Sequence, residues 1–389
     1  MYHSMKRTLR PLYTILLLLV LGGTLTLRVV LHQNRSLYLK YQTPSLQTPK
    51  KPVFNETLLR YAAADLAESK LKKEIEDLLE GNFGSRGRQR SFLSSGKYHI
   101  DVRLRSSRGM PLQLRSPEFH RLWQSFRRHL GDWSRNRRFY SDVMPELVNE
   151  IKSFIDGEKG SREKYKSCAV VGNSGILLKK DYGEMIDSHE SVIRLNNARI
   201  RGFERNVGWK TNISFVNSNI LHLCARREGC FCHPYGMNVP MIMYICQPAH
   251  FLDYLVCNAS HKAPLIVTNP RFDTLCARIV KYYSLKRFVE ATGKDPVEWA
   301  PSHDGSNFHY SSGMQAVMLA LGVCERVSVF GFGKSKVARH HYHTNQKAEL
   351  SLHDYEAEYD FYRDLMQGSE AIIPFISDKF KFPRIVMYH

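Results

Sequence analysis

The chain has 389 residues, of which 43% are hydrophobic, an ordinary apolar content for a globular protein with one large domain and additional segments. The formal net charge of +19 would suit a nucleic-acid binder, but the excess is uneven. Thirteen arginines are concentrated between residues 86 and 138: Arg86, Arg88, Arg90, Arg103, Arg105, Arg108, Arg115, Arg121, Arg127, Arg128, Arg135, Arg137 and Arg138. The N-terminus nevertheless predicts a membrane-anchored chain, and for that reason we predict no nucleic-acid partner.

The N-terminus predicts a membrane anchor. Residues 1–10 contain Lys6, Arg7 and Arg10, and the stretch from Pro11 to Leu27 has no charged residue. A bilayer core requires about 20 apolar residues, and an anchor over 11–31 reaches that length if Arg28 extends its charged end to the interface. A cleaved signal peptide is the alternative, but no small-x-small cleavage site follows. Because basic residues stay cytoplasmic, the bulk of the chain is expected to be lumenal.

Sequons and cysteines fit a lumenal chain. Four N-glycosylation sequons begin at Asn34, Asn55, Asn212 and Asn258, and Asn212 has apolar neighbours that could bury it. All eight cysteines lie beyond residue 160, a pattern typical of disulfides in an oxidising compartment. The cluster of Cys224, Cys230, Cys232 and His233 resembles a zinc site, but its spacing favours disulfides, whose pairing the spacing leaves open.

Composition separates a tether from a folded domain. Residues 32–115 contain prolines, one short amphipathic helix around Leu66–Leu79 and a Gly-, Ser- and Arg-rich stretch, which together predict a stem. Helical periodicity returns at Ser116, where Phe119, Leu122, Trp123, Phe126 and Leu130 follow one helix face, and a second helix is expected over Met144–Ile155. We therefore expect the catalytic domain to cover 116–389.

Beyond residue 160, short apolar runs alternate with helical stretches. This alternation predicts an α/β fold with a mostly parallel sheet flanked by helices on both faces, whose ligands bind at the carboxyl ends of the strands. The expected strands are Cys168–Val171, Val192–Leu195, Thr211–Val216, Met241–Ile245, Pro264–Thr268 and Val327–Phe330, and expected helices include Thr274–Tyr283 and Gly313–Leu321.

Two segments carry the signature of a phosphate site. The first is a strand followed by the turn Gly172-Asn173-Ser174-Gly175, which can bring backbone N–H groups to a phosphate, and Asn196 ends the next strand at the same edge. The second is Ser311-Ser312-Gly313 at the start of an apolar helix, where backbone donors lack partners and the dipole is positive. Taken alone, the second segment could be an ordinary serine cap.

Histidines follow in two groups. His340, His341 and His343 could hold a metal, supply imidazole to a phosphate or lie in solvent, and their spacing does not converge easily on one ion. His353 falls in a predicted helix that begins with a capping box of Ser351 and Asp354. In the first turn of that helix the dipole would keep the imidazole neutral, as a general base requires, although a surface histidine is the simpler interpretation.

That last helix predicts its own buried face and end. The expected buried residues are Leu352, Tyr355, Tyr359, Tyr362 and Met366, and Gly368 would end the helix. One absence also bears on the chemistry, because the chain contains no Asp-x-Asp pair of the kind that holds a divalent cation on a nucleotide diphosphate. A transferase with this sequence would neutralise its leaving group with amides, hydroxyls and histidine, and we predict no metal or other cofactor.

Four blocks, in this order, resemble the motifs of the eukaryotic sialyltransferase family, glycosyltransferase family 29. Cys168–Asn217 resembles the large motif and Tyr310–Gly333 the small motif. His341–Thr344 resembles the third motif, and His353–Glu358 resembles the very small motif. The resemblance covers roughly 160–389, and the anchor, stem and intervening segments look most similar to plant sialyltransferase-like proteins, which are associated with galactose transfer in arabinogalactan synthesis.

The resemblance implies a metal-independent variant of the Rossmann-like transferase fold, called GT-A, and inverting transfer from a nucleotide sugar. His353 would be the general base, His341 would contact the donor phosphate, and Cys168 and Cys324 would form a disulfide. The residues that would hold the nucleotide sugar are Asn173, Ser174, Gly175, Asn196, Ser311, Ser312, Gly313 and His341. His343, Thr344 and Gly333 depart from the usual motifs, and these departures affect the shape of the donor and acceptor sites.

We therefore expect a Golgi type II membrane glycosyltransferase with a lumenal catalytic domain. Its expected donor is of the CMP-sialic acid type, and its expected acceptors are galactose-ended glycans of glycoproteins. One alternative is a galactosyltransferase that uses UDP-galactose to extend the galactan chains of arabinogalactan. The other is a catalytically silent protein that binds nucleotide sugars and forms complexes with other Golgi transferases.

Overall fold

The computed structural model describes residues 54–81, 116–137, 143–156, 163–221, 224, 232–303, 305, 308–333, 338–344, 352–368 and 371–388, together with positions 24 and 28. The chain divides into two compact units, Met1–Val53 and Phe54–His389. The predicted tail at 1–10, nearly all of the predicted anchor at 11–31, and Asn34 lie outside the described residues. Among the helices of the described part, none has the length and apolar character needed to cross a bilayer.

The second unit is built on a seven-stranded sheet in which every neighbouring pair is parallel. Its order is β5-β4-β3-β2-β1-β6-β7, so the chain builds outward from β1 in one direction and then crosses to β6 on the other side. The strands are β1 (Cys168–Val171), β2 (Ser191–Leu195), β3 (Ile213–Asn217), β4 (Met241–Tyr244), β5 (Leu265–Val267), β6 (Arg326–Phe330) and β7 (Arg384–Tyr388). The predicted parallel α/β fold is confirmed; β7 was not predicted.

Helices cover both faces of the sheet because both faces of its central strands are apolar. Within β1, Cys168 and Val170 join one hydrophobic core, while Ala169 and Val171 join another on the opposite face. The helices are α2 (Glu56–Ala63), α3 (Glu68–Leu79), α4 (Pro117–Arg135), α5 (Val143–Asp156), α6 (Gly183–Asp187), α7 (Glu204–Val207), α8 (Ser218–Leu221), α9 (Phe251–Ser260), α10 (Pro270–Thr292), α11 (Trp299–Ser302), α12 (Ser312–Val323) and α13 (Tyr355–Leu365), with short 3-10 turns η1 (Gly175–Lys179), η2 (Pro248–His250) and η3 (Pro296–Glu298).

The three cores divide the helices among the faces. Residues of α10 and α12 share the largest core with β1, β2 and β3. A second core joins α3, α4 and α9 to β3, β4 and β5. A third core lies around α6 and α7 beside β1 and β2. The carboxyl edge of the sheet stays accessible between these layers, which is where parallel α/β proteins bind ligands.

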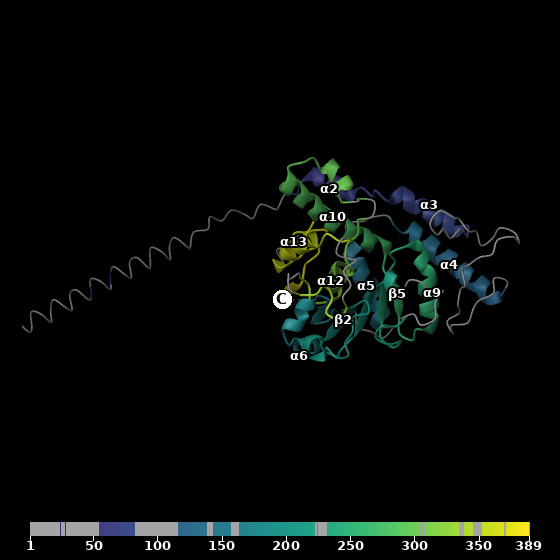
Figure 1. Cartoon of the computed structure of the whole chain (residues 1–389), viewed down its shortest axis with the longest axis horizontal. Coiled ribbons are helices and arrows are strands. Elements are labelled where there is room, and N and C mark those ends of the chain that lie inside the picture. Colours follow the sequence, from purple (N-terminus) through teal and green to yellow (C-terminus); the bar gives the residue numbers. More distant parts are fainter. Residues whose placement is uncertain are drawn as a thin grey trace, which may run out of the picture. The chain divides into compact units, whose positions relative to one another are not determined.

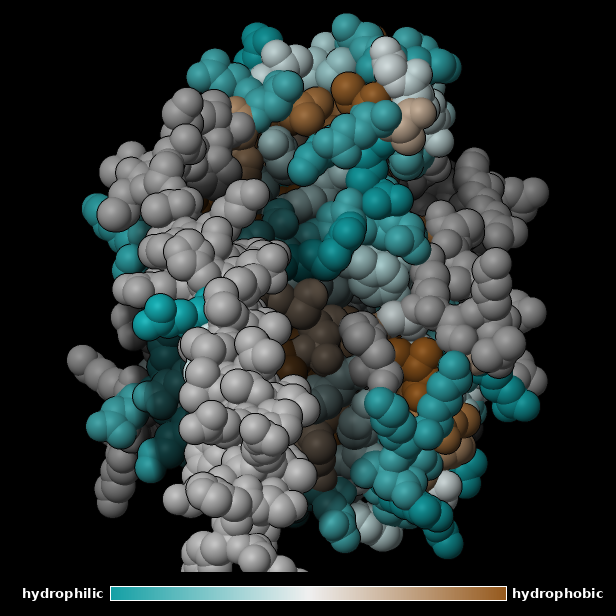
Figure 2. All heavy atoms as spheres, turned by 90° about the vertical axis from the view of Figure 1, so that its left-hand side faces the viewer, coloured by the Kyte–Doolittle hydropathy of each residue, from teal (hydrophilic) through white to brown (hydrophobic). Residues whose placement is uncertain are grey.

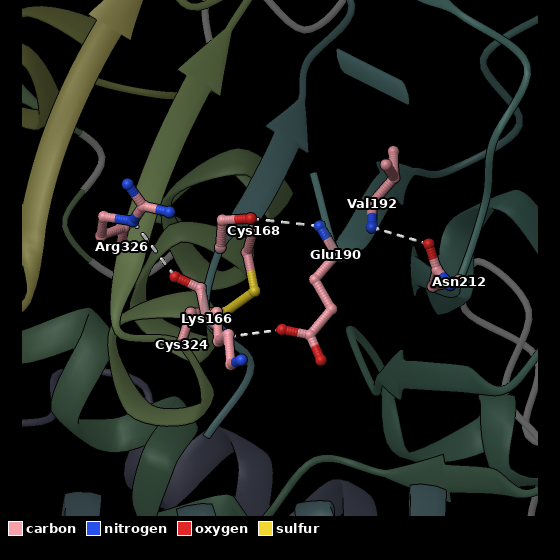
Figure 3. The surroundings of a disulfide bond; sticks show 8 residues. Lys166, Cys168, Glu190, Val192, Asn212, Cys324 and Arg326 are labelled. Carbon is pink, nitrogen blue, oxygen red and sulfur yellow. Dashed lines mark hydrogen bonds between the residues drawn. A yellow bond between two sulfur atoms is a disulfide. The ribbon is translucent and has the colours of Figure 1, made fainter. Parts of the chain in front are cut away.

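The predicted disulfide between Cys168 and Cys324 is present, with a Cα–Cα distance of 6.0 Å. It joins the first residue of β1 to the residue that ends α12, at the amino edge of the sheet (Figure 3). Beside it, the Lys166 N–H donates to the carboxylate of Glu190 over 2.6 Å. Because the C-terminal end of α12 is at the amino edge and the helix crosses the sheet, its N-terminus lies at the carboxyl edge.

Other described cysteines also form disulfides, and the described sequon asparagines lie on the surface. Cys232 pairs with Cys257, and Cys224 is also disulfide-bonded. Asn55, Asn212 and Asn258 are all exposed, so the expectation that Asn212 could be buried was wrong. Its amide oxygen accepts a hydrogen bond from Val192 N–H (Figure 3), which leaves the amide nitrogen clear of that contact.

The packed unit starts earlier than we predicted. Helices α2 and α3 lie within the expected stem of 32–115, yet Leu58 and Ala62 are part of the largest core and Ile75 and Leu78 are part of the second. Figure 1 shows α2 beside α10 and α3 beside α4. The Lys281 ammonium of α10, whose pKa burial lowers to about 8, donates to the Ala64 carbonyl over 2.6 Å. The compact unit therefore begins at Phe54 rather than at 116.

This boundary predicts different stabilities for two fragments. The free energy of unfolding should be roughly 5 kcal/mol lower for a fragment of 116–389 than for a fragment of 54–389. The shorter fragment lacks three buried Leu and Ile side chains, which contribute about 1.5–3 kcal/mol each. Chemical denaturation of both fragments measures the difference. Equal unfolding free energies would mean that α2 and α3 are only attached to the surface.

Candidate active site

A cavity of about 920 Å³ opens at the carboxyl edge of the sheet. It lies at the switch point between β1 and β6, since Gly172–Ser174 follow β1 and Gly331–Gly333 follow β6. The ends of β2, β3 and β4 add Asn196, Asn217 and Tyr244 to its wall. The face in Figure 2 is hollowed near its centre, with apolar side chains deep in the hollow and hydrophilic residues above it.

The structure brings almost all predicted site residues to this one cavity. The lining residues include Asn173, Ser174, Asn196, Ser311, Ser312, Gly313, His341 and His353. Gly175 is the exception, because its N–H donates to the Arg339 carbonyl over 3.0 Å and a Cβ at this position would lie 2.5 Å from that oxygen. Gly175 therefore holds a neighbouring loop in place and does not face the cavity, contrary to our prediction.

The turn after β1 is closely packed against the turn after β6. A Cβ on Gly172 would lie 2.7 Å from the Gly331 carbonyl oxygen, so only glycine allows this approach. The Ser174 hydroxyl donates to the Gly333 carbonyl over 2.8 Å. The two turns thus form one closely packed floor of the cavity. The hydroxyl hydrogen of Ser174 is donated to this contact between the turns.

Asn196 and Asn217 form a polar rim at the ends of β2 and β3. Asn196 adopts a left-handed conformation (φ 52°), and its side-chain oxygen accepts a hydrogen bond from Asn217 N–H over 3.0 Å. The Asn217 amide then donates to the Ser312 hydroxyl over 2.8 Å. Because the Ser312 oxygen accepts this bond, its hydrogen remains a donor for an anion. Asn217 ended the large motif but had no predicted role; its place at a strand end was the available signal.

The N-terminus of α12 is held by Glu358. One carboxylate oxygen accepts from Ser311 N–H and the other from the Ser311 hydroxyl, both over 2.6 Å. The Ser311 oxygen also accepts from Met314 N–H and so caps α12. Burial raises the pKa of Glu358, opposed by His353 and by the Ser311 hydrogen bonds. Ser311 therefore orients the helix end, and Ser312 and Gly313 are left to face a ligand.

Tyr342 anchors the third motif. Its N–H donates to the Asn173 carbonyl over 2.8 Å, its hydroxyl donates to the Arg199 carbonyl over 2.7 Å, and its ring lies in the third core. The rings of His340 and His341 stack at 4.5 Å, and those of His341 and His343 are nearly parallel at 5.7 Å. The three rings thus form a stack, of which His340 and His341 line the cavity, and burial, followed by Arg199, lowers the pKa of His343.

The described residues contain one cluster with the ligand types and spacing of a metal site, which consists of Cys224, Cys232 and Cys257. All three sulfurs are committed to disulfides, so the residues do not fit a zinc site. The carboxylate among the described lining residues of the cavity is that of Glu358, and Ser311 occupies both of its oxygens.

His353 lies just before α13 rather than in its first turn. Asp354 is the N-cap, with its carboxylate accepting from Ala357 N–H, and Ser351 lies outside the described residues. His353 therefore does not have the place in the first helical turn from which we predicted that the helix dipole would keep its imidazole neutral. Instead, His353 Nδ1 donates to the His309 carbonyl over 3.0 Å, because a carbonyl can only accept. In the neutral ring, Nε2 then carries the lone pair, as a general base requires.

A second tether fixes the residue beside the base. The Trp299 indole N–H donates to the Ser284 hydroxyl over 2.9 Å, and that hydroxyl donates to the Asp354 carboxylate over 2.6 Å. The predicted buried face of α13 was wrong in phase: Leu352 and Met366 are exposed, and the buried residues are Ala357, Glu358, Phe361, Tyr362 and Leu365. Of the predicted face, Tyr362 is buried and Tyr355 and Tyr359 are half-buried, whereas Leu352 precedes the helix and Met366 follows its last residue.

Cys246 and His309 also line the cavity, and sequence reasoning missed both. Cys246 is a free cysteine after β4, and burial raises the pKa of its thiol. His309 lies in the segment that precedes α12, and burial, followed by His353, lowers the pKa of its imidazole. Cys246 directly follows the predicted strand Met241–Ile245, so its place at a strand end was an available signal, whereas the sequence around His309 offers no comparable one.

The Glu358 contact predicts a loss of nucleotide affinity in Glu358→Gln. An amide accepts at one oxygen only, so one Ser311 donor loses its partner and the end of α12 is less firmly held. We expect the Kd of UMP or CMP, measured by titration calorimetry, to rise about tenfold. Glu356→Gln, an exposed change on the same helix, is the control. An unchanged Kd in Glu358→Gln would show that this contact does not shape the cavity.

Comparison with known proteins identifies the family. Residues 113–369 match the profile of glycosyltransferase family 29 (sialyltransferase). A protein of Arabidopsis thaliana named beta-1,6-galactosyltransferase GALT29A is 50% identical over 400 residues, covering 99% of this chain and 100% of its own. Sialyltransferase-like protein 1 of Oryza sativa subsp. japonica is 49% identical over 408 residues, covering 99% and 100%. The mouse alpha-N-acetylgalactosaminide alpha-2,6-sialyltransferase 2 is 28% identical over 254 residues, covering 58% and 65%. The chain belongs to glycosyltransferase family 29.

Proposed function

We propose that this chain is a galactosyltransferase that moves galactose from UDP-galactose onto a galactan acceptor, with inversion at the anomeric carbon. The observation that carries this proposal is the 50% identity, over both full lengths, to a protein named as a beta-1,6-galactosyltransferase. The likeness to the mouse sialyltransferase is 28% and covers 58% of this chain. The sequence led us to expect a CMP-sialic acid donor first and UDP-galactose second, and we now propose UDP-galactose first.

The proposed reaction is a single in-line displacement. The acceptor hydroxyl loses its proton to His353 Nε2 while its oxygen forms the new bond to the anomeric carbon. The bond from that carbon to the nucleotide oxygen breaks on the opposite face, and the nucleotide leaves with both bonding electrons. The hydrogen bond from Nδ1 to the His309 carbonyl supports this role, because it orients the ring and stabilises the imidazolium that forms.

The leaving nucleotide gains negative charge, which the cavity can stabilise with groups already in place. The N-terminus of α12 offers backbone N–H groups and a positive dipole, and Ser312 offers a hydroxyl hydrogen. His341 and Arg339, which line the cavity, add imidazole and guanidinium donors. These contacts support transfer in which the protein itself neutralises the phosphate.

Sialic acid transfer is the second candidate, and one feature favours it. Glu358 is the single carboxylate among the described lining residues, and both of its oxygens accept from Ser311, so these residues do not offer the pair of carboxylates that holds a divalent cation on a diphosphate. A CMP-linked donor carries one phosphate and leaves less charge to neutralise. The acceptor would then be a galactose-ended glycan of a glycoprotein.

We also propose that the protein is a single-pass type II membrane protein of the Golgi with a lumenal catalytic unit. The apolar stretch of 11–31 after a basic tail supports this location. Exposed sequon asparagines at 55, 212 and 258 and the disulfides of the catalytic unit are consistent with a secretory compartment.

A donor screen tests the proposed function. The full-length chain is incubated with UDP-galactose or CMP-sialic acid, with a galactan and a galactose-ended glycoprotein as acceptors, each with and without EDTA. We expect transfer from UDP-galactose to galactan that EDTA does not abolish, since the phosphate contacts come from the protein. Transfer from CMP-sialic acid alone would contradict the proposal and support the second candidate.

The base role is tested with His353→Ala. We expect kcat to fall by a factor of about 10²–10⁴, the usual contribution of general base catalysis, with little change in the nucleotide Kd. His189→Ala is a matched control, because its Nδ1 also bonds a backbone carbonyl but the residue lies outside the cavity. A folded His353→Ala enzyme with wild-type kcat would rule His353 out as the base.

A further inference from the structure

A second cavity, of about 640 Å³, lies at the carboxyl end of β5. Its wall comes from the last turns of α4, the start of α9 and the residues that lead from β5 into α10. The volume is in the range of small-molecule and oligosaccharide sites. None of the motifs of the family resemblance contributes to it, and the catalytic scheme above does not use it.

The second cavity is next to the first along the same edge of the sheet. Met243 of β4 is paired with Val267 of β5, and Thr268 N–H donates to the Met243 carbonyl over 2.9 Å. The residue after Met243, Tyr244, lines the catalytic cavity, while Val267 and Thr268 line the second. Lining residues of the two cavities are therefore about one strand spacing apart, roughly 5 Å.

The wall of the second cavity is aromatic. Trp133 of α4 packs edge to face on Phe251 at 5.8 Å, and His129 packs edge to face on Tyr254 at 5.5 Å. The Nε1 of Trp133, a buried donor, has no hydrogen-bond partner within the part of the chain that the structure describes. Aromatic rings of this kind suit the apolar C–H face of a pyranose, and the Arg137 guanidinium already lies over the Trp133 ring, 4.9 Å from its centroid.

Polar groups around these rings offer both donors and acceptors. His129 Nδ1 donates to the Ser125 carbonyl over 2.7 Å, so Nε2 of the neutral ring can accept. The side-chain oxygen of Asn269 accepts from Arg271 N–H, so its amide nitrogen can donate. The carboxylate of Asp132 is 54% exposed at the rim.

The charges around the second cavity select among ligand classes. Arg271 is paired with Glu146 at 3.1 Å, Asp132 with Arg135, and Arg137, whose guanidinium lies over the Trp133 ring, with Asp65 at 3.5 Å. Each of these cations therefore has an anionic partner, which leaves little attraction for a phosphate or an acidic sugar. Hydroxyl groups, which donate and accept at once, match this set of neutral and paired groups. The chemistry therefore favours a neutral, hydroxyl-rich chain with apolar ring faces.

We propose that this second cavity binds sugar residues of the acceptor chain beyond the one that receives the transferred sugar. The inference rests on the proposed function, because it assumes an oligosaccharide acceptor whose reactive end lies in the catalytic cavity. The enzyme would then bind long galactan acceptors more tightly than short ones, and His129 and Asp132 would set this length preference.

The test compares β-linked galacto-oligosaccharides of increasing length, from a disaccharide to a hexasaccharide, as acceptors of the full-length enzyme. For the wild type, KM should fall as the acceptor lengthens. In His129→Ala and Asp132→Asn, KM for the hexasaccharide should rise roughly fivefold to tenfold, while kcat, KM for the donor and KM for the disaccharide stay unchanged. His120→Ala is the matched control, since His120 is exposed on the same helix and does not line the cavity.

An equal rise of KM for short and long acceptors, or no dependence on length in the wild type, would overturn the proposal. Calorimetric binding of the hexasaccharide without donor separates this inference from the proposed function. If binding weakens in His129→Ala while no galactose is transferred, the second cavity is an oligosaccharide site and the proposed reaction is wrong. If galactose is transferred but hexasaccharide binding is the same in both proteins, the reaction stands and the proposed subsite is wrong.

Discussion

The contact on which the site depends is the pair of hydrogen bonds from Ser311 to the buried carboxylate of Glu358. It joins α13, which follows His353, to the N-terminus of α12, where a phosphate would bind. These segments are far apart in sequence. Together with the hydrogen bond from His353 Nδ1 to the carbonyl of His309, just before α12, this contact fixes the proposed base relative to the proposed phosphate site. A buried carboxylate is costly unless its oxygens are satisfied, and here one serine satisfies both.

The sheet supplies the frame for that contact. Because the order of strands reverses between β1 and β6, the turns after these strands diverge and leave a cavity at the carboxyl edge. The disulfide between Cys168 and Cys324 fixes the far end of α12 at the amino edge, so the helix spans the sheet and presents Ser312 and Gly313 to the cavity. Tyr342 in turn binds the segment that contains His340, His341 and His343 to the turn after β1.

Much of this architecture could be predicted from sequence, and the exceptions have physical reasons. The six predicted strands all occur, within two residues of their expected bounds, because buried parallel strands read as continuous apolar runs. Eight of the nine predicted site residues line the cavity, whereas Gly175 is needed for backbone packing, which a glycine alone does not distinguish from ligand contact. Glu358 was missed as a site residue because periodicity assigns a carboxylate to the surface. The packing of α2 and α3 into the compact unit was not predicted, because both are short, charged helices with few apolar residues. Those residues are buried only by their contacts with α10 and α4.

The central claim is that one cavity holds the nucleotide and the base together, with the phosphate at the N-terminus of α12 and His353 Nε2 beside the acceptor. A crystal structure of the full chain with UDP and a galacto-oligosaccharide tests it most directly. The account predicts a phosphate oxygen within hydrogen-bond distance of Ser312 or His341, and the acceptor hydroxyl within about 3 Å of His353 Nε2. A nucleotide bound away from α12, or an acceptor hydroxyl with no path to His353, would contradict it.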